Sequence, residues 1–395
     1  MKKKRFIISE HDEQLREKLE KARDTALRIV EKNAYKHSSG DLYPVGKYDN
    51  GCYTWDVNGG PNGPCWTEGF WPGQLWIGYE LTDKEIFRKV AERCVDNFYK
   101  RVDENYHIDW HHDTGFLYSL SCVAAYKLTG NERACKAAKM AAYSLSRRFR
   151  QRGEFIQNMR SEVDPDDYRF IVDTMMNLPL LFWMSDETGE ESYRQKAIKH
   201  AETTRKYIIR EDGSTYHHFL MDFQTAGPVR GLTLQGAGDE SCWSRGQAWM
   251  IYAAPLMYDF TGDESWIATF EKVADYFISH LPADSIPYWD FDMTDIPGEP
   301  RDSSAAAIAA CGIMEMARYL PAESGKMAMY IETAKKMLLT LVDCYATSYG
   351  EQEEALVRHV TGSKPHGSFD SCTVYGDYFY LEALMRATHT WDRYW

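Results

Sequence analysis

The chain has 395 residues, which is long enough for one large domain or two smaller ones. Its 46 basic and 59 acidic residues give a net charge of −13, which argues against nucleic acids and anionic membranes as partners. An apolar fraction of 44% suffices for a large core, and no run of 18 apolar residues is present that could span a membrane.

The beginning of the chain and its cysteines bear on where the protein works. Residues 1–5 are basic, but the apolar run 6–8 is too short for a secretion signal. The nine cysteines form no Cys-x-x-Cys motif, which is typical of free thiols in a reducing compartment. We therefore expect a cytoplasmic protein. The sequence does not indicate its oligomeric state.

The first predicted element is an amphipathic helix over residues 10–32. Its apolar residues recur at spacings of three and four, which places them on one helical stripe: Leu15, Leu19, Ala22, Ala26 and Val30. A loop rich in Gly, Asn and Pro is predicted over 35–68, and loops of this length are often functional.

Two kinds of helix then alternate along the chain. One kind is apolar nearly all round and must be buried on several sides, over 69–81, 114–128, 173–184, 246–260, 303–319 and 377–388. The other kind is charged and amphipathic, over 83–102, 132–149, 190–208, 264–281 and 324–344. Short hairpins are predicted within 214–222 and 285–293.

With the first helix added to the amphipathic set, this alternation predicts six inner and six outer helices. We predict an all-α fold, an α6/α6 double-alpha barrel of six helical hairpins, as a single domain over residues 1–395. An open helical solenoid is the structural alternative. Each inner helix begins with polar or aromatic residues, and six such starts at one mouth would form a single pocket.

Asp113 and Asp173 are the strongest catalytic candidates. Each precedes an apolar helix, so each could simply be a helix N-cap. Two observations favour chemistry: His111 and His112 crowd Asp113, and the apolar run 170–172 would desolvate Asp173 and raise its pKa. A carboxyl group with a raised pKa can act as a general acid, and two converging carboxyl groups suggest sugar chemistry.

Segment 235–249 is dense in polar groups. Arg245 could grip a substrate carboxylate in a bidentate fork, or it could pair with Asp239 or Glu240. Trp249 lies four residues after Arg245 and so shares its helical face.

Cofactor signals are weak throughout the chain. His217 and His218 are adjacent and cannot share a helical face, which disfavours a metal site. The sequence contains no Gly-rich phosphate loop and no Gly-x-Ser-x-Gly nucleophile motif. We predict neither a metal nor another cofactor.

Five motifs in family order resemble the unsaturated glucuronyl hydrolases of glycoside hydrolase family 88, and the resemblance covers about residues 10–395. They are Cys65-Trp66-Thr67-Glu68-Gly69-Phe70-Trp71-Pro72-Gly73, His112-Asp113-Thr114-Gly115, Trp243-Ser244-Arg245-Gly246-Gln247-Ala248-Trp249, Arg301-Asp302-Ser303-Ser304-Ala305-Ala306 and Tyr375-Gly376-Asp377-Tyr378.

The resemblance implies an α6/α6 barrel and an intracellular enzyme. Its substrates would be disaccharides that lyases release from hyaluronan, chondroitin or heparin, with a 4,5-unsaturated uronic acid at the non-reducing end. The family reaction hydrates the C4=C5 vinyl ether, after which the hemiketal opens and the other sugar is expelled.

Roles for individual residues also follow from the resemblance. Asp173 would protonate C4 and help to activate water, and Asp113 would hold ring hydroxyls and stabilise the developing positive charge. Positions matching family substrate contacts are Trp66, Phe70, His112, Gln235, Arg245, Trp249 and one of His217 or His218, of which we favour His218.

The chain departs from the family pattern in two places. Some relatives carry a Trp after an Ile-Gln pair, where this chain reads Ile156-Gln157-Asn158-Met159 and so lacks that stacking face for the reducing-end sugar. Sulfate-accepting relatives carry Ser-x-x-Ser-x-Lys, which this chain matches only in part, with Ser363, Lys364 and Ser368 as candidate sulfate contacts.

Three other functions remain open at this point. Unsaturated rhamnogalacturonyl hydrolases would share the barrel and the chemistry but act on pectin-derived disaccharides. An ordinary inverting glycosidase would release a saturated sugar. A non-catalytic sugar-binding barrel would use Asp113 and Asp173 only as helix caps.

Overall fold

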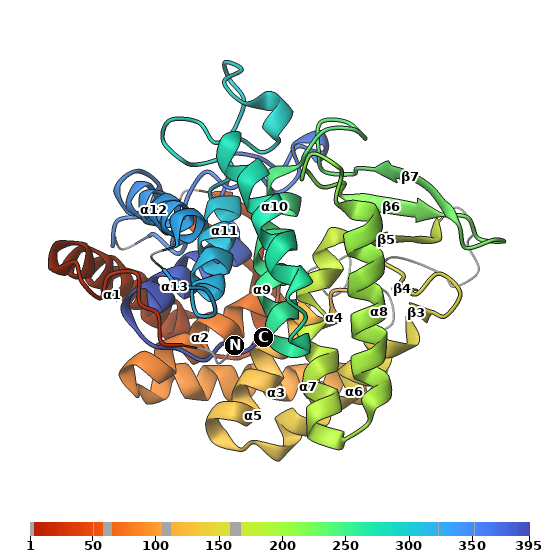
Figure 1. Ribbon diagram of the computed structural model, residues 1–395. Helices are drawn as coiled ribbons and strands as arrows, with labels where there is room; N and C mark the ends of the chain where they lie inside the picture. Colours follow the sequence, from red (N-terminus) through yellow and green to blue (C-terminus); the bar gives the residue numbers. More distant parts are fainter. Residues whose placement is uncertain are drawn as a thin grey trace. The chain divides into compact units, whose positions relative to one another are not determined.

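The computed structural model describes residues 4–49, 51–57, 65–104, 112–158, 167–322, 324–350 and 352–395, and most of them are helical (Figure 1). In these ranges no helix is both long and apolar enough to cross a membrane. The chain forms two compact units. The first comprises Met1–Arg28, Ile208–His217 and Gly231–Asp392, and the second comprises Ile29–Tyr207, His218–Arg230 and Arg393–Trp395.

Buried and amphipathic helices alternate in the second unit, as the sequence predicts. The buried ones are α2 (Phe70–Thr82), a continuous run of α4 (Thr114–Tyr118), a π-helical turn (Ser119–Val123) and α5 (Ala124–Thr129), and then α7 (Pro179–Thr188). The amphipathic ones are α3 (Glu85–Asp103), α6 (Glu132–Arg147) and α8 (Glu191–Ile208).

The first unit continues the same alternation. Its buried helices are α9 (Ser244–Thr261), α11 (Ser303–Met316) and α13 (Val374–Thr388), and its amphipathic helices are α10 (Ser265–Ser279) and α12 (Gly325–Thr340), which a π-helical turn (Leu341–Tyr345) extends. Helix α1 (Glu13–Lys36) starts in the first unit and ends in the second. With the 114–129 run counted as one, the described residues hold the twelve helices that the sequence predicts.

A buried ionic cluster ties the three inner helices of the first unit together. Arg386 on α13 donates to Glu382 Oε1 at 2.8 Å, to Glu315 Oε2 on α11 at 2.6 Å and to the Tyr252 hydroxyl on α9. These four side chains are nearly inaccessible to solvent. Removing one partner would leave a buried charge unpaired, which is strongly destabilising.

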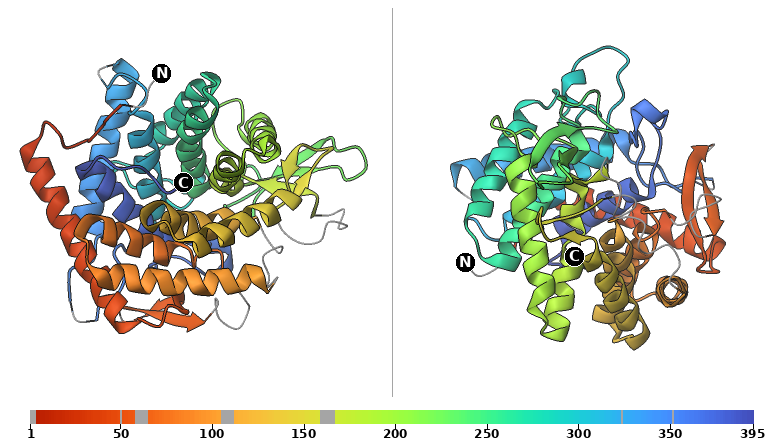
Figure 2. Two further views of the ribbon diagram at one scale, coloured as in Figure 1. Left: turned by 90° about the horizontal axis from the view of Figure 1, so that it is seen from below. Right: turned by 90° about the vertical axis from the view of Figure 1, so that its right-hand side faces the viewer.

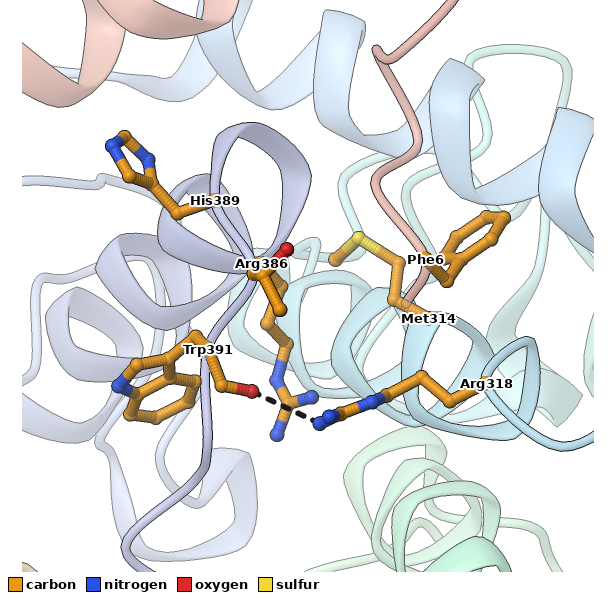
Figure 3. A pocket seen from close by; sticks show the side chains of 7 residues that line it. Phe6, Met314, Arg318, Arg386, His389 and Trp391 are labelled. Atoms are coloured by element: carbon orange, nitrogen blue, oxygen red, sulfur yellow. Dashed lines mark hydrogen bonds between the residues drawn. The ribbon is translucent and has the colours of Figure 1, made fainter. Parts of the chain in front are cut away.

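The N-terminal segment also joins this unit, beside a small cavity (Figure 3). The Lys4 amide donates to the Arg318 carbonyl at 2.7 Å, and Arg318 Nη1 donates to the Trp391 carbonyl at 2.9 Å. The chain before α1 is therefore held against the end of α11.

The loop predicted over 35–68 contains a hairpin that we did not predict. Strands β1 (Leu42–Asp49) and β2 (Cys52–Val57) pair antiparallel, and buried Tyr43 packs edge-on against Phe98 of α3. Pro44 and the glycines hid the strand pattern, although the dipeptide Asn50-Gly51 is a strong hairpin signal.

A three-stranded antiparallel sheet of β5 (Arg169–Ile171), β6 (His218–Met221) and β7 (Pro228–Leu232) packs against α8 (Figures 1 and 2). The short strands β3 (Phe149–Arg150) and β4 (Phe155–Ile156) form a separate pair. Only the end of the predicted hairpin 214–222 is a strand, and 285–293 contains a 3-10 turn (Phe291–Met293) and single bridges to other segments.

The segment around Asp173 also differs from the predicted helix 173–184. Residues Val172–Met176 form a 3-10 turn, and α7 starts only at Pro179. Proline lacks the N–H that a helix interior requires but suits a first helical turn, so Pro179 fixes this later start. Asp173 therefore lies on a turn before the buried helix.

Candidate active site

The two candidate catalytic aspartates lie on adjoining backbone segments of the second unit. The side chain of Asn177 accepts a hydrogen bond from the Phe116 amide at 2.7 Å and donates one to the Asp173 carbonyl at 3.2 Å. Gly115 packs so closely on Asn177 that a Cβ there would lie 2.4 Å from the Asn177 Cα. The start of α4 and the 3-10 turn are thus fixed to each other.

Helix capping does not account for either aspartate. Asp113 occupies the N-cap position of α4 but makes no side-chain capping hydrogen bond, and Asp173 lies inside its 3-10 turn, whose N-cap is Ile171. Asp302 does cap a helix, because its carboxylate accepts from the Ser304 amide. Asp173 is only 9% exposed, so its carboxyl group is largely removed from solvent.

A chain of polar contacts connects Asp113 to a histidine on the sheet. His112 Nε2 lies 3.1 Å from Asp113 Oδ1, and His112 Nδ1 lies 3.2 Å from the Asn158 carbonyl. The Asn158 amide nitrogen lies 3.1 Å from His218 Nδ1. His218 is paired across the sheet with Ile171, two residues before Asp173. His112, Asp113, His218 and Asp173 therefore gather in one part of the second unit.

Aromatic rings border the same region. The ring of Trp66 lies 5.8 Å from Phe70 and 5.5 Å from Phe116, and Phe70 lies 5.4 Å from Phe116. Since Phe116 follows Asp113 by three residues, this cluster adjoins the start of α4. Flat apolar faces of this kind suit the stacking of sugar rings.

The two adjacent histidines belong to different units. His217, in the first unit, accepts from the Leu234 amide at 3.3 Å, and its ring lies 4.3 Å from that of Trp243. His218 is the one that contacts the network of His112 and Asp113 through Asn158. We favoured His218 from the sequence as the substrate contact, and that role stays a prediction.

The remaining candidate residues lie in the first unit, where Arg245 is the centre of a hydrogen-bond network. Its Nη1 donates to Asp302 Oδ2 and to the Thr361 carbonyl at 2.6 Å, while its Nη2 donates to Gln235 Oε1 at 3.1 Å and to the Gly362 carbonyl. Arg245 therefore holds Gln235 and the 361–362 backbone in place.

The partner of Arg245 differs from those we considered from sequence. Asp239 accepts from the Thr233 amide at 2.9 Å, and Glu240 accepts from the Tyr216 hydroxyl at 3.1 Å. Pairing of Arg245 with Asp239 or Glu240 is therefore wrong, because the buried carboxylate of Asp302 takes that place. Trp249 is fully buried, with its ring 5.3 Å from Phe379.

The three candidate sulfate contacts lie in one tight turn. Ser363 and Ser368 exchange backbone hydrogen bonds of 2.7 and 3.0 Å. The Lys364 ammonium is ion-paired with Glu299, which also accepts from Trp289 Nε1 at 2.7 Å. Glu299 lines a cavity of about 490 Å³ in the first unit, a volume suited to a small molecule.

Two asparagines of the site were not predicted from sequence. Asn158 and Asn177 are fully buried and connect the candidate residues to one another. The signal for Asn177 was a polar residue inside an apolar run of methionines and leucines. Among the described residues, no group of three or more His, Cys, Asp or Glu side chains could hold a metal ion.

Comparisons with known proteins agree with these features. Residues 32–283 match the family described as Glycosyl Hydrolase Family 88. The unsaturated chondroitin disaccharide hydrolase of Streptococcus pneumoniae is 39% identical over 331 residues, covering 84% of this chain and 83% of the relative.

Solved structures match over the full length. The unsaturated glucuronyl hydrolase of Streptococcus agalactiae has a TM-score of 0.90 at 36% identity, with 100% of both chains covered. A mutant of that enzyme complexed with dGlcA-GalNAc6S has a TM-score of 0.82 at 34% identity, again with 100% of both chains covered. These enzymes are α6/α6 barrels, which confirms the predicted fold class.

Proposed function

Because the chain belongs to glycosyl hydrolase family 88, we propose that it releases 4,5-unsaturated uronic acid from the non-reducing end of glycosaminoglycan disaccharides. The disaccharides are those that polysaccharide lyases leave behind, and the bond that reacts first is the C4=C5 vinyl ether.

The reaction proceeds by hydration. A proton adds to C4, and the cation that develops at C5 and the ring oxygen accepts water at C5. The resulting hemiketal opens to a ketone, and the hemiacetal left at C1 expels the second sugar. A carboxyl group that gives a proton and a carboxylate that stabilises positive charge are the two groups this sequence of steps needs.

We assign these roles to Asp173 and Asp113. Asp173 gives its proton to C4 and then helps to remove a proton from the attacking water, while Asp113 holds ring hydroxyls and stabilises the cation. The single observation that carries this assignment is the Asn177 bridge, which joins the Phe116 amide, three residues after Asp113, to the Asp173 carbonyl. The burial of Asp173 also favours the protonated acid before reaction.

The other candidate residues bind the substrate in this proposal. Trp66 and Phe70 offer ring faces, and His112 and His218 belong to the chain of polar contacts that leads to Asp113. By the match of their motifs to the family, Gln235, Arg245 and Trp249 contact the sugar, and Ser363, Lys364 and Ser368 contact a sulfate group where the substrate has one.

Loss of ultraviolet absorbance tests the proposal, because hydration removes the C4=C5 double bond. We expect the absorbance of unsaturated chondroitin or hyaluronan disaccharides to fall with the wild-type protein. Asp173→Asn should slow this fall by about 10²–10⁴-fold, since a positioned acid contributes about that much. Asp186→Asn is the matched control on α7, where the side chain is 64% exposed, and it should keep full activity.

Three outcomes would contradict the proposal in different ways. Release of a saturated sugar at constant absorbance would indicate an ordinary glycosidase. Faster turnover of pectin-derived than of glycosaminoglycan-derived disaccharides would indicate a rhamnogalacturonyl hydrolase. Full activity of Asp173→Asn would remove Asp173 from the mechanism.

We also propose a cytoplasmic location for this reaction, with no nucleic acid or membrane partner. All nine cysteines are free thiols, as expected in a reducing compartment, and the net charge of −13 disfavours polyanionic surfaces.

A further inference from the structure

We propose that Asn158 is a positioning residue that sets where the ring protons of His112 and His218 reside. The inference deepens the proposed function, on which its catalytic consequence rests. Asn158 is fully buried in the second unit and contacts both histidines, one through its backbone and one through its side chain.

The backbone contact fixes the proton of His112. The Asn158 carbonyl accepts from Arg148 Nη2 at 2.9 Å and faces His112 Nδ1 at 3.2 Å. A carbonyl oxygen can only accept, so His112 Nδ1 carries a hydrogen. Nε2 is then the atom that faces Asp113 Oδ1, at 3.1 Å.

The side-chain contact fixes the proton of His218. The amide nitrogen of Asn158 lies 3.1 Å from His218 Nδ1, and an amide nitrogen can only donate. Nδ1 of His218 is therefore the acceptor, and the neutral ring carries its hydrogen on Nε2. In this tautomer the N–H donor of the buried His218 ring is Nε2.

Asn158 can perform this role because its own segment is rigid. The backbone N–H of Asn158 donates to the Arg169 carbonyl at 3.1 Å, and the backbone N–H of Ile156 donates to Nδ1 of buried His200 at 2.9 Å. Arg148 Nε also donates to the Gln157 carbonyl at 2.9 Å. Segment 156–158 is thus held from three sides between His112 and the sheet that carries His218.

The first test needs no substrate, so it is independent of the proposed function. Nitrogen-15 NMR of the histidine rings should show a bare Nδ1 for His218 and a protonated Nδ1 for His112 in the wild-type protein near neutral pH. A protonated Nδ1 on His218 or a bare Nδ1 on His112 would overturn the assignment.

The second test uses Asn158→Asp, which keeps the shape but replaces the donating amide by an accepting carboxylate. His218 should then carry its proton on Nδ1, which the same NMR experiment detects. We expect kcat to fall by about 10–100-fold, which is less than the roughly 10²–10⁴-fold that a positioned acid contributes. The change in KM should be smaller. Asn131→Asp is the control, because Asn131 caps α6 and Asp caps equally well, so activity should not change.

A double mutant separates positioning from a general loss of structure. In His218→Gln the amide of Gln supplies an N–H donor that does not depend on a tautomer. If Asn158 acts on catalysis through His218, adding Asn158→Asp to His218→Gln should change kcat by less than about threefold. If the fall in kcat of the double mutant instead equals the product of the falls in the two single variants, Asn158 acts elsewhere and the proposal is overturned.

Discussion

Two cations that an acidic sugar could attract, Arg245 and Lys364, are each paired with a carboxylate of the first unit. Arg245 is buried against Asp302, and four of its hydrogen bonds go to protein acceptors. The guanidinium group of Arg245 therefore holds Gln235 and the backbone of residues 361–362 in place. Lys364 is less buried, with 28% of its side chain exposed, so its pairing with Glu299 is open to competition from a ligand.

Glu299 is the residue that we expect to control sulfate preference. The Lys364 ammonium lowers the pKa of the Glu299 carboxyl group, which keeps it charged at neutral pH. Glu299→Gln removes this competing charge, so the ratio of turnover on sulfated to unsulfated disaccharides should rise about two- to fivefold, the range expected for one partly exposed ion pair.

Lys364→Ala provides the control for this change. If Lys364 contacts sulfate, its removal should lower the ratio of turnover on sulfated to unsulfated disaccharides. In that variant, adding Glu299→Gln should no longer change the ratio. An unchanged ratio in both single variants would show that neither residue contacts a sulfate group.

At the scale of elements, the catalytic geometry depends on close contact between two segment starts. The start of α4 and the 3-10 turn that carries Asp173 approach each other at Gly115, where only a residue without a Cβ fits. Pro179 contributes by delaying α7, which leaves Asp173 on a turn instead of inside a helix. The positions of both aspartates therefore follow from backbone packing as much as from side-chain chemistry.

Gly115→Ala tests this dependence directly. The added methyl would lie 2.4 Å from the Asn177 Cα, so the two segments must move apart. We expect a loss of about 1–3 kcal/mol in the free energy of unfolding and a fall in kcat, because overpacking shifts the backbone. Gly325→Ala at the start of α12, where an added Cβ meets no atom within 4 Å, should leave both quantities nearly unchanged. Full activity of Gly115→Ala would show that this contact does not set the distance between the aspartates.

At the scale of the whole molecule, buried ionisable groups make stability depend on pH. His200 is fully buried, and its removal from solvent, assisted by repulsion from His112, lowers its pKa to about 3. Its ring stays neutral in the folded protein at pH values where it is charged in the unfolded chain, whose histidines titrate near 6.5.

The sign of this effect follows from proton binding. Between about pH 6.5 and 3 the unfolded state binds one more proton at His200 than the folded state, so stability falls as the pH is lowered through this window. The slope from this residue is at most about 1.4 kcal/mol per pH unit. Replacing His200 with Gln should flatten the decline of the thermal midpoint between pH 6.5 and 4.5. An equally steep decline in the variant would show that other groups cause it.

Much of the architecture could be predicted from sequence because it follows from local patterns. Runs that are apolar nearly all round indicated every buried helix, and the number of helices in the described residues agrees with the prediction. Motif order alone indicated the family, and with it a role for Asp113 and Asp173. The β1-β2 hairpin was missed because Pro44 and the glycines obscured its strand pattern, and the late start of α7 was missed although Pro179 is a signal for a first helical turn.

The sequence by itself determined the helical composition, the fold class and the chemical type of the candidate groups, because these depend on residue identity and spacing. Only the tertiary structure decided which groups meet: His218 rather than His217 contacts Asn158, Asp302 pairs with Arg245, and Asn177 joins the two aspartate segments. Such contacts join residues far apart in the chain, and a hydrogen bond depends on atomic positions that no local pattern encodes.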